Sequence, residues 1–182
     1  MKFLATKLPG VFEIEAAATH DARGFFARLY CPEAFAKAGI AFQSTQINLS
    51  RNLAPFTLRG MHWQDAPFAE AKLVRVTSGA AYDVVVDIRP HSPTFRHWIA
   101  CHLDAERANA LFIPEGCAHG FLTLAPNTDL LYQMGRTFVP GHASGFRWDD
   151  PSIAITWPAL PAVISPEDLA WPSLWNSRPC AS

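Results

Sequence analysis

Short apolar segments separated by turn residues fill the centre of this chain, and this pattern constrains the fold more than any other feature. Residues 72–78 place Lys72, Val74 and Val76 on one face of an extended segment, Gly79 marks a turn, and the β-branched run at residues 82–88 follows directly. Short segments of this kind, bounded by turn signals, are typical of β-strands. We predict further strands at similar spacing over residues 97–103, 110–113, 121–124, 129–134 and 153–157.

The remaining segments are predicted to contain few helical residues. Residues 11–15, 21–30 and 42–49 have the composition of strands, whereas residues 89–94 contain two prolines and are expected to form a loop. A short helix is expected at residues 31–39, because Pro32 suits a first helical turn and Gly39 favours its end, and another near residues 166–170. The pattern predicts an all-β sandwich or barrel. The length fits one domain over residues 1–182, with a proline-rich tail from about residue 158.

The composition excludes several classes of function. The 182 residues carry a formal net charge of −1, so there is no basic excess to bind nucleic-acid phosphates. No apolar run is long enough to span a membrane, and the N-terminus lacks the features of a secretion signal. Cys31, Cys101, Cys117 and Cys180 have no spacing typical of a zinc or redox motif, which favours reduced thiols in a cytoplasmic protein.

Two polar stretches interrupt the apolar pattern. Residues 58–72 contain Arg59, His62 and Lys72, and residues 113–121 contain a Pro-x-Gly-x-x-His pattern that ends at His119. In cupin-type barrels this second pattern turns the chain so that its histidine points into the barrel. A lone histidine is most often structural, but two inward-pointing histidines in one barrel favour a site. We therefore expect these groups to converge on a ligand at the mouth of a small barrel.

A metal site is one interpretation of the two histidines. Cupin metal centres resemble a pair of histidines separated by one residue, then a glutamate, then a later histidine. Here Gln64 stands in place of the second histidine, and glutamine is a weak ligand for first-row transition metals. Lys72 lies about where a further ligand is needed, and an ammonium is a poor neighbour for a divalent cation. The pattern therefore disfavours a metal.

The same residues suit acid–base chemistry without a metal. A neutral imidazole can accept a proton, since the ordinary pKa of histidine, about 6.5, lies near neutral pH. Lys72 and His119 would stabilise a carbonyl oxygen as it becomes an enolate. Tyr132, on a later strand, would supply an acid on the other side of a sugar ring. The alternative interpretation of Tyr132 is an aromatic that merely lines the barrel.

In order and spacing these motifs resemble the dTDP-4-dehydrorhamnose 3,5-epimerases, which are cupin-fold enzymes of L-rhamnose donor synthesis. The resemblance extends over roughly residues 1–170, and the matching segments are DARGFF (21–26), QINLS (46–50), LRGMHWQ (58–64), KLVRVTSG (72–79), DVVVDIRPHSPT (83–94), IPEGCAHGF (113–121), Tyr132 and RWDDPSIAITW (147–157). It implies a cupin-type jelly roll and the epimerisation of a nucleotide-linked 4-keto-6-deoxy sugar at C3, C5 or both. It also implies that no cofactor is needed, and that two chains form a homodimer in which strands of one subunit extend the other's sheet.

The resemblance assigns roles to individual residues. His62 would remove the proton next to the C4 ketone, and Asp168 would orient His62. Lys72 would stabilise the enolate oxygen, and Tyr132 would return a proton from the opposite face. The residues expected to bind the nucleotide-linked sugar are Arg23, Phe26, Arg28, Gln46, Asn48, Arg59, His119 and Phe138.

Four positions depart from the family's pattern, and all four lie on the nucleotide side in that family. Arg28 and Ala143 stand where glutamates are usual, Phe138 replaces a tyrosine that packs on thymine, and Glu167 replaces a lysine. A site built for one base can reject another strongly. The departures therefore leave open an epimerase that uses another nucleotide, or one that acts on a single carbon.

Two other classes of function remain as alternatives. A metal-dependent cupin enzyme would bind a metal and lose activity with a chelator. A non-catalytic sugar-nucleotide binding protein would retain the barrel but not the acid–base residues. The joint presence of His62, Lys72, Tyr132 and Asp168 disfavours this alternative.

Overall fold

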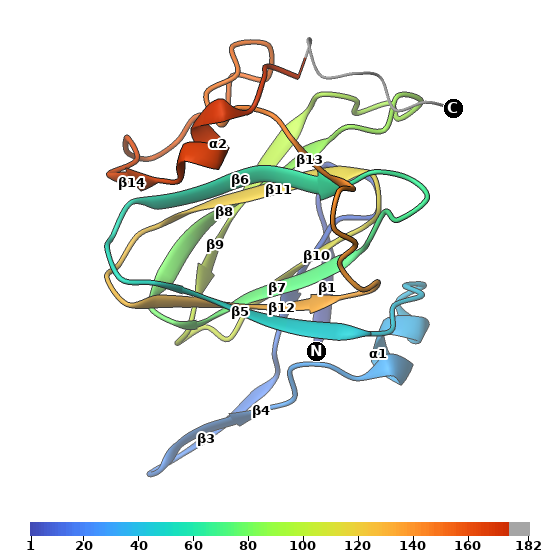
Figure 1. The fold of residues 1–182 in the computed structure, drawn as a ribbon. Helices are drawn as coiled ribbons and strands as arrows, with labels where there is room; N and C mark the ends of the chain where they lie inside the picture. The colour runs from blue at the N-terminus through green and yellow to red at the C-terminus, as the bar shows by residue number, and fades with distance from the viewer. Residues whose placement is uncertain (175–182) are drawn as a thin grey trace.

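The computed structural model describes residues 1–174, and in this part of the chain two β-sheets lie face to face (Figure 1). The lower sheet has the order β1 (Lys2–Ala5), β2 (Phe12–Glu15), β10 (Ala110–Ile113), β7 (Lys72–Ser78), β12 (Thr128–Met134) and β5 (Gln46–Asn52). The upper sheet has the order β13 (Ala143–Gly145), β6 (Thr57–Gln64), β11 (Cys117–Thr123), β8 (Ala80–Asp87) and β9 (Trp98–Asp104). A short strand, β14 (Val163–Ile164), pairs in parallel with β6.

The connections between the sheets are those of a jelly roll. The strands from β5 to β12 are distributed in the orders β10-β7-β12-β5 and β6-β11-β8-β9. Two four-stranded antiparallel sheets wound in this way form the eight-stranded jelly roll. The expected all-β, cupin-type jelly roll is therefore confirmed.

The main core lies between the two sheets. Val74 and Val76 of β7 point inward and pack with Val85 of β8 and Phe121 of β11. This packing between the sheets explains why inward-pointing valines alternate with other residues over residues 72–78, as predicted. Strand β8 is buried on both faces because its alternate residue Val84 packs outward, under the C-terminal part of the chain.

Two short helices cover the outer faces of the sandwich, at the predicted places. Helix α1 (Pro32–Lys37) packs on the lower sheet through Phe35, which contacts Phe112 of β10 edge to face. Helix α2 (Pro166–Ala170) lies above β6 in Figure 1. The strands β3 (Ala18–Asp21) and β4 (Gly24–Ala27) form a separate two-stranded sheet, and their hairpin extends away from the sandwich.

Several predicted strands need correction. The strand predicted at residues 21–30 is confined to β4 (Gly24–Ala27), and the strand predicted at residues 121–124 is β11, which begins at Cys117. Residues 153–157 form a turn and an irregular segment, with Ala154 in the left-handed backbone region (φ 55°). The prediction was wrong because Ile153 and Ile155 bury their side chains on the outer face of the upper sheet without joining an edge. Strand β5 begins at Gln46 and not at residue 42, because Phe42 belongs to the aromatic cluster around Phe35.

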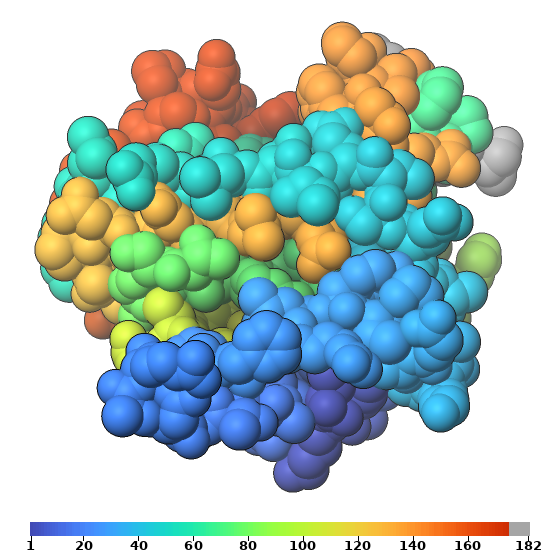
Figure 2. Space-filling model, turned by 90° about the horizontal axis from the view of Figure 1, so that it is seen from below, coloured from blue at the N-terminus to red at the C-terminus, as the bar shows by residue number. Residues whose placement is uncertain are grey.

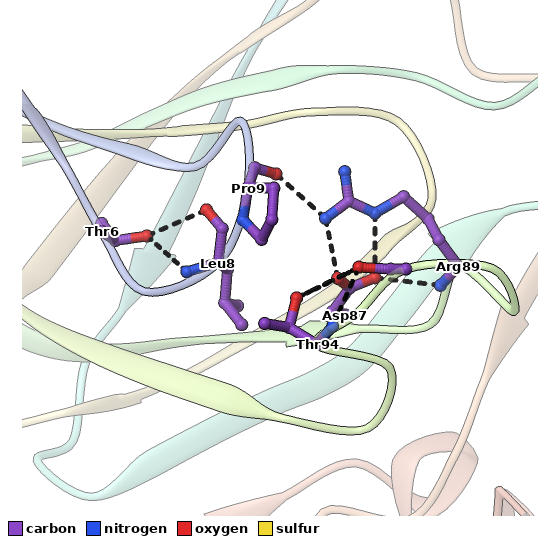
Figure 3. A network of polar contacts seen from close by, with 7 residues as sticks. Thr6, Leu8, Pro9, Asp87, Arg89 and Thr94 are labelled. Carbon is purple, nitrogen blue, oxygen red and sulfur yellow. Dashed lines mark hydrogen bonds and ion pairs between the residues drawn. The ribbon is translucent and has the colours of Figure 1, made fainter.

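A polar network closes one end of the sandwich (Figure 3). Asp87, at the end of β8, is fully buried and accepts hydrogen bonds from Arg89, Ser92 and Thr94. Arg89 also donates to the carbonyl oxygen of Pro9, at 2.9 Å, which ties the N-terminal loop to the loop after β8. The loop expected at residues 89–94 is therefore an ordered part of the fold.

Candidate active site

A cavity of about 680 Å³ opens between the two sheets, beside α2. Eight of the predicted site residues line it: Asn48, Arg59, His62, Lys72, His119, Tyr132, Phe138 and Asp168. They come from both sheets, from the loop after β12 and from α2, so they are brought together only by the tertiary fold.

A close polar contact in the cavity joins His62 to Asp168. The His62 Nε2 atom of β6 lies 2.5 Å from Asp168 Oδ1 of α2, and Asp168 Oδ2 accepts a hydrogen bond from the Gly60 backbone at 3.3 Å. The Ser165 hydroxyl caps α2 by accepting from the Asp168 amide, which fixes the start of this helix. The Asp168 side chain is 6% exposed, whereas that of His62 is 41% exposed.

The charge of Asp168 follows from its contacts. Burial alone would raise the pKa of Asp168, but the hydrogen bonds from His62 and Gly60 outweigh it and hold that pKa below its ordinary value. Asp168 is therefore an anion at neutral pH. A carboxylate beside Nε2 favours the tautomer with its proton on Nε2, which leaves the lone pair on Nδ1. In that tautomer Nδ1 is the His62 atom that can accept a proton.

A second histidine–carboxylate pair lies next to the first. His119 of β11 is directly opposite His62 of β6 in the strand register. Its Nε2 atom lies 2.9 Å from an oxygen of Asp83, which is fully buried in β8. His119 is held more rigidly than His62, since only 5% of its side chain is exposed.

Strands β6 and β11, which carry the two histidines, approach each other closely at a pair of glycines. A Cβ atom on Gly60 would lie 2.6 Å from the Gly120 Cα atom, and Gly60 has a φ of 124°, which favours glycine. The register of β6 and β11 shifts at this point, between His119 and Phe121. The glycines therefore permit the irregular pairing that places both histidines at the cavity.

The lower sheet supplies the groups on the other side of the cavity. Tyr132 of β12 lies opposite Asn48 of β5 and contacts the His119 ring edge to face, with centroids 5.9 Å apart. Burial, reinforced by the Asp83 carboxylate, raises the pKa of Tyr132 well above its ordinary value. Tyr132 therefore keeps its proton and can act as an acid.

The other predicted binding residues fall into two groups. Gln46 lies beside the cavity, where it donates to Asn48 and accepts from the Phe138 amide. Arg23, Phe26 and Arg28 belong to the β3–β4 hairpin and the residue just after it, and they do not line this cavity within one chain. Arg23 forms an exposed ion pair with Asp21 instead.

Several lining residues were not predicted. Trp171 contacts the His62 ring, with centroids 6.1 Å apart, and Glu70 forms an ion pair with Lys72. Glu70 lies in the loop before β7, so its contact with Lys72 depends on the path of that loop. Trp171 directly follows α2, so its place beside His62 depends on how this helix packs above β6.

The part of the chain that the structure describes contains no group of three or more His, Cys, Asp or Glu side chains arranged to hold a metal ion. Cys31, Cys101 and Cys117 are free thiols, and Cys180 lies outside the described residues. None of the helices in residues 1–174 has the length and apolarity needed to cross a membrane.

Comparisons with known proteins point to one family. The family model described as dTDP-4-dehydrorhamnose 3,5-epimerase matches residues 5–176. A relative of that name from Sinorhizobium fredii is 40% identical over 155 residues, which cover 85% of this chain and 80% of the relative.

Solved structures give the same result. A dTDP-6-deoxy-D-glucose-3,5-epimerase from Legionella pneumophila, in complex with dTDP-4-keto-L-rhamnose, is 33% identical with a TM-score of 0.92, covering 97% of this chain and 94% of the other. ChmJ, a 3'-monoepimerase from Streptomyces bikiniensis solved with dTDP-quinovose, is 31% identical with a TM-score of 0.88, covering 93% and 86%.

Proposed function

Since the chain belongs to the dTDP-4-dehydrorhamnose 3,5-epimerase family, we propose that it is a cofactor-independent epimerase of a nucleotide-linked 4-keto-6-deoxy sugar. The observation that carries the proposal is the His62–Asp168 pair at 2.5 Å, which opens onto the same cavity as Lys72 and Tyr132. This set provides a base, an anion that orients it, a cation and an acid.

The reaction uses these groups in sequence. His62 removes the proton next to the C4 ketone, and the electrons of the broken C–H bond form an enolate whose charge rests on the C4 oxygen. The Lys72 ammonium stabilises this oxygen. Tyr132 then donates its proton to the opposite face of the carbon, which inverts the centre. Proton exchange with water returns His62 and Tyr132 to their starting states.

Substrate binding is assigned to the polar groups at the rim. Arg59 is exposed at the cavity, and its Nε atom donates to Asn52 at 2.9 Å, which orients the guanidinium. A guanidinium suits the diphosphate of a nucleotide sugar. Asn48 and His119 provide further hydrogen-bonding groups, and the half-exposed Phe138 ring supplies a surface for a base.

The test is proton NMR in D2O with 4-keto-6-deoxy sugars linked to dTDP, UDP, GDP and CDP. We expect loss of the C3 or C5 proton signal with at least one sugar, undiminished by EDTA and abolished in H62A. Loss of activity with EDTA, restored by metal, would favour a metal-dependent cupin enzyme instead. Exchange with none of the four sugars would contradict the proposal.

A different nucleotide is a second candidate, and a specific observation favours it. Three of the four departures from the family's pattern, Phe138, Ala143 and Glu167, line the cavity itself. The same NMR panel decides between the candidates. Faster exchange of a UDP-, GDP- or CDP-linked sugar would support an altered base site, and exchange of the dTDP-linked sugar alone would exclude it. The carbons that exchange identify epimerisation at C3, C5 or both.

We also propose that the protein is a single-domain cytoplasmic homodimer. The hairpin β3–β4 exposes Phe25 and Phe26, which are 42% and 80% exposed, and β5 at the edge of the lower sheet exposes Ile47 and Leu49. Figure 2 shows β5 and β12 uncovered beside the N-terminal segments. An isolated hairpin has little stability of its own, so pairing with a second copy would stabilise it.

Such a dimer would carry the predicted binding residues Arg23, Phe26 and Arg28 toward a neighbouring cavity, since they lie on or beside this hairpin. The measurement is molar mass by light scattering. F26D is expected to convert the dimer to monomer and to weaken substrate binding, and a monomeric wild-type protein would contradict the proposal.

A further inference from the structure

Glu70 is a buried acid that the reaction above does not use. It lies in the segment between β6 and β7, and only 3% of its side chain is exposed. Moving a carboxylate out of water is costly unless its charge and its lone pairs find partners. Its partners therefore show what the residue does.

Each oxygen of Glu70 has a different partner. The Oε1 atom lies 3.2 Å from the Lys72 Nζ atom, and the Oε2 atom accepts a short hydrogen bond from the Gln64 side chain. Lys72 itself is 10% exposed, and it lines the cavity together with Glu70 and Gln64. The ammonium is thus held by one buried carboxylate at the cavity wall.

Gln64 extends this set of contacts to the mouth of the cavity. Its amide group donates to the Phe68 carbonyl oxygen at 3.2 Å, and its Oε1 atom accepts from the Val139 amide at 2.7 Å. Val139 follows Phe138, the exposed aromatic that lines the cavity. Continuous contacts therefore connect the segment that carries Phe138 to the lysine ammonium.

We propose that Glu70 is a positioning residue, which holds the Lys72 ammonium where the enolate oxygen forms and links it through Gln64 to the segment that carries Phe138. The proposal rests on the proposed epimerase function, because it takes Lys72 as the group that stabilises the enolate. A lysine side chain is long and flexible. Fixing its end matters because a misplacement of about 1 Å can cost roughly 100-fold in rate.

The first test compares two substitutions of Glu70. E70A removes both contacts, and we expect kcat for C–H exchange to fall roughly 10- to 100-fold while KM changes less than about threefold. E70Q keeps the shape and one oxygen that can accept from Lys72, but its NH2 group then faces the NH2 group of Gln64. Its rate is therefore expected to lie between those of wild type and E70A. The matched control is E13Q, which alters an ion-paired glutamate that does not line the cavity.

A double-mutant cycle separates positioning from mere support of the fold. If Glu70 acts through Lys72, E70A should cause no further loss of exchange in a K72A background. Additive losses, or an E70A variant as active as wild type while the wild type exchanges its substrate, would overturn the proposal. Failure of the wild type to exchange any sugar would count against the proposed function.

A measurement without substrate keeps the inference testable in that case. Reductive methylation followed by mass spectrometry reports how freely each lysine meets the reagent. Loss of the contact should raise the labelling rate of Lys72 at least about threefold in E70A. The labelling rate of Lys72 in E13Q and that of Lys37 in E70A should equal the wild-type rates. Equal labelling of Lys72 in E70A and wild type would refute the positioning role, whatever the substrate.

Discussion

Replacing Asp168 by asparagine tests the pair on which the proposed mechanism depends. The change preserves shape and the acceptor for the Gly60 amide, which Asp168 holds at 3.3 Å. It removes the negative charge 2.5 Å from His62 Nε2. An asparagine can also present its NH2 group to the ring, which would favour the wrong tautomer for a base with its lone pair on Nδ1. Both effects act on the transition state, where His62 becomes positively charged.

The size of the effect follows from the charges and their exposure. Two unit charges about 4 Å apart attract by roughly 4 kcal/mol at an effective dielectric constant of about 20. The His62 side chain is 41% exposed, so screening by water reduces this value, and we take about half as the lower bound. A loss of about 2–4 kcal/mol corresponds to a fall in rate of roughly 30- to 1,000-fold.

The assay is the rate of solvent-deuterium incorporation at saturating substrate, with melting temperature measured in parallel. We expect D168N to fold, to bind substrate with a KM close to that of wild type, and to lose rate within the range above. D149N is the matched control, because Asp149 forms an exposed ion pair with Arg147 and does not line the cavity. A D168N rate within about threefold of wild type would refute the role of Asp168.

Three further predictions concern the acid, the strand contact and the closing network. Y132F should still wash the substrate proton out into D2O but should form inverted product at least about tenfold more slowly, because the proton donor is lost; equal loss of both rates would contradict this role. G60A should lower stability by about 3 kcal/mol, seen as a fall in melting temperature of roughly 6–12 °C, because its Cβ would lie 2.6 Å from Gly120. For Asp87, burial tends to raise the pKa, but bonds from Arg89 and neighbouring hydroxyls lower it far below its ordinary value. The stabilisation of the fold by the Asp87 carboxylate is thus complete above about pH 5 and is lost as pH falls below about 4. The urea midpoint should therefore fall more steeply with decreasing pH in wild type than in D87N.

The sequence predicted the strands whose pattern is decided by burial between the sheets. The predicted bounds 72–78 and 110–113 match β7 and β10, since each alternates between an inner face and a covered outer face. Residues 153–157 have the same apolar alternation, yet they pack across a sheet instead of joining one. A single sequence cannot separate these cases, because both bury the same side chains.

The site was predictable where its residues belong to compact motifs, and not where it depends on register. Arg59, His62 and Lys72 lie in one stretch, and the pattern that ends at His119 marks the second histidine. The pairing of Glu70 with Lys72 and Gln64 depends on how a loop folds back between two strands. The position of Arg28, away from the cavity of its own chain, depends on a hairpin whose strands join neither of the two large sheets within residues 1–174.

The division of the acid and the base between two sheets suits an inversion. His62 and Asp168 reach the cavity from the upper sheet and the helix above it, whereas Tyr132 reaches it from the lower sheet. A flat enolate bound between the sheets would therefore meet the base on one face and the acid on the other. In the proposed mechanism, reprotonation by Tyr132 from the lower sheet would invert the carbon. For this reason loss of Tyr132 should separate proton removal from inversion, while loss of His62 should abolish both.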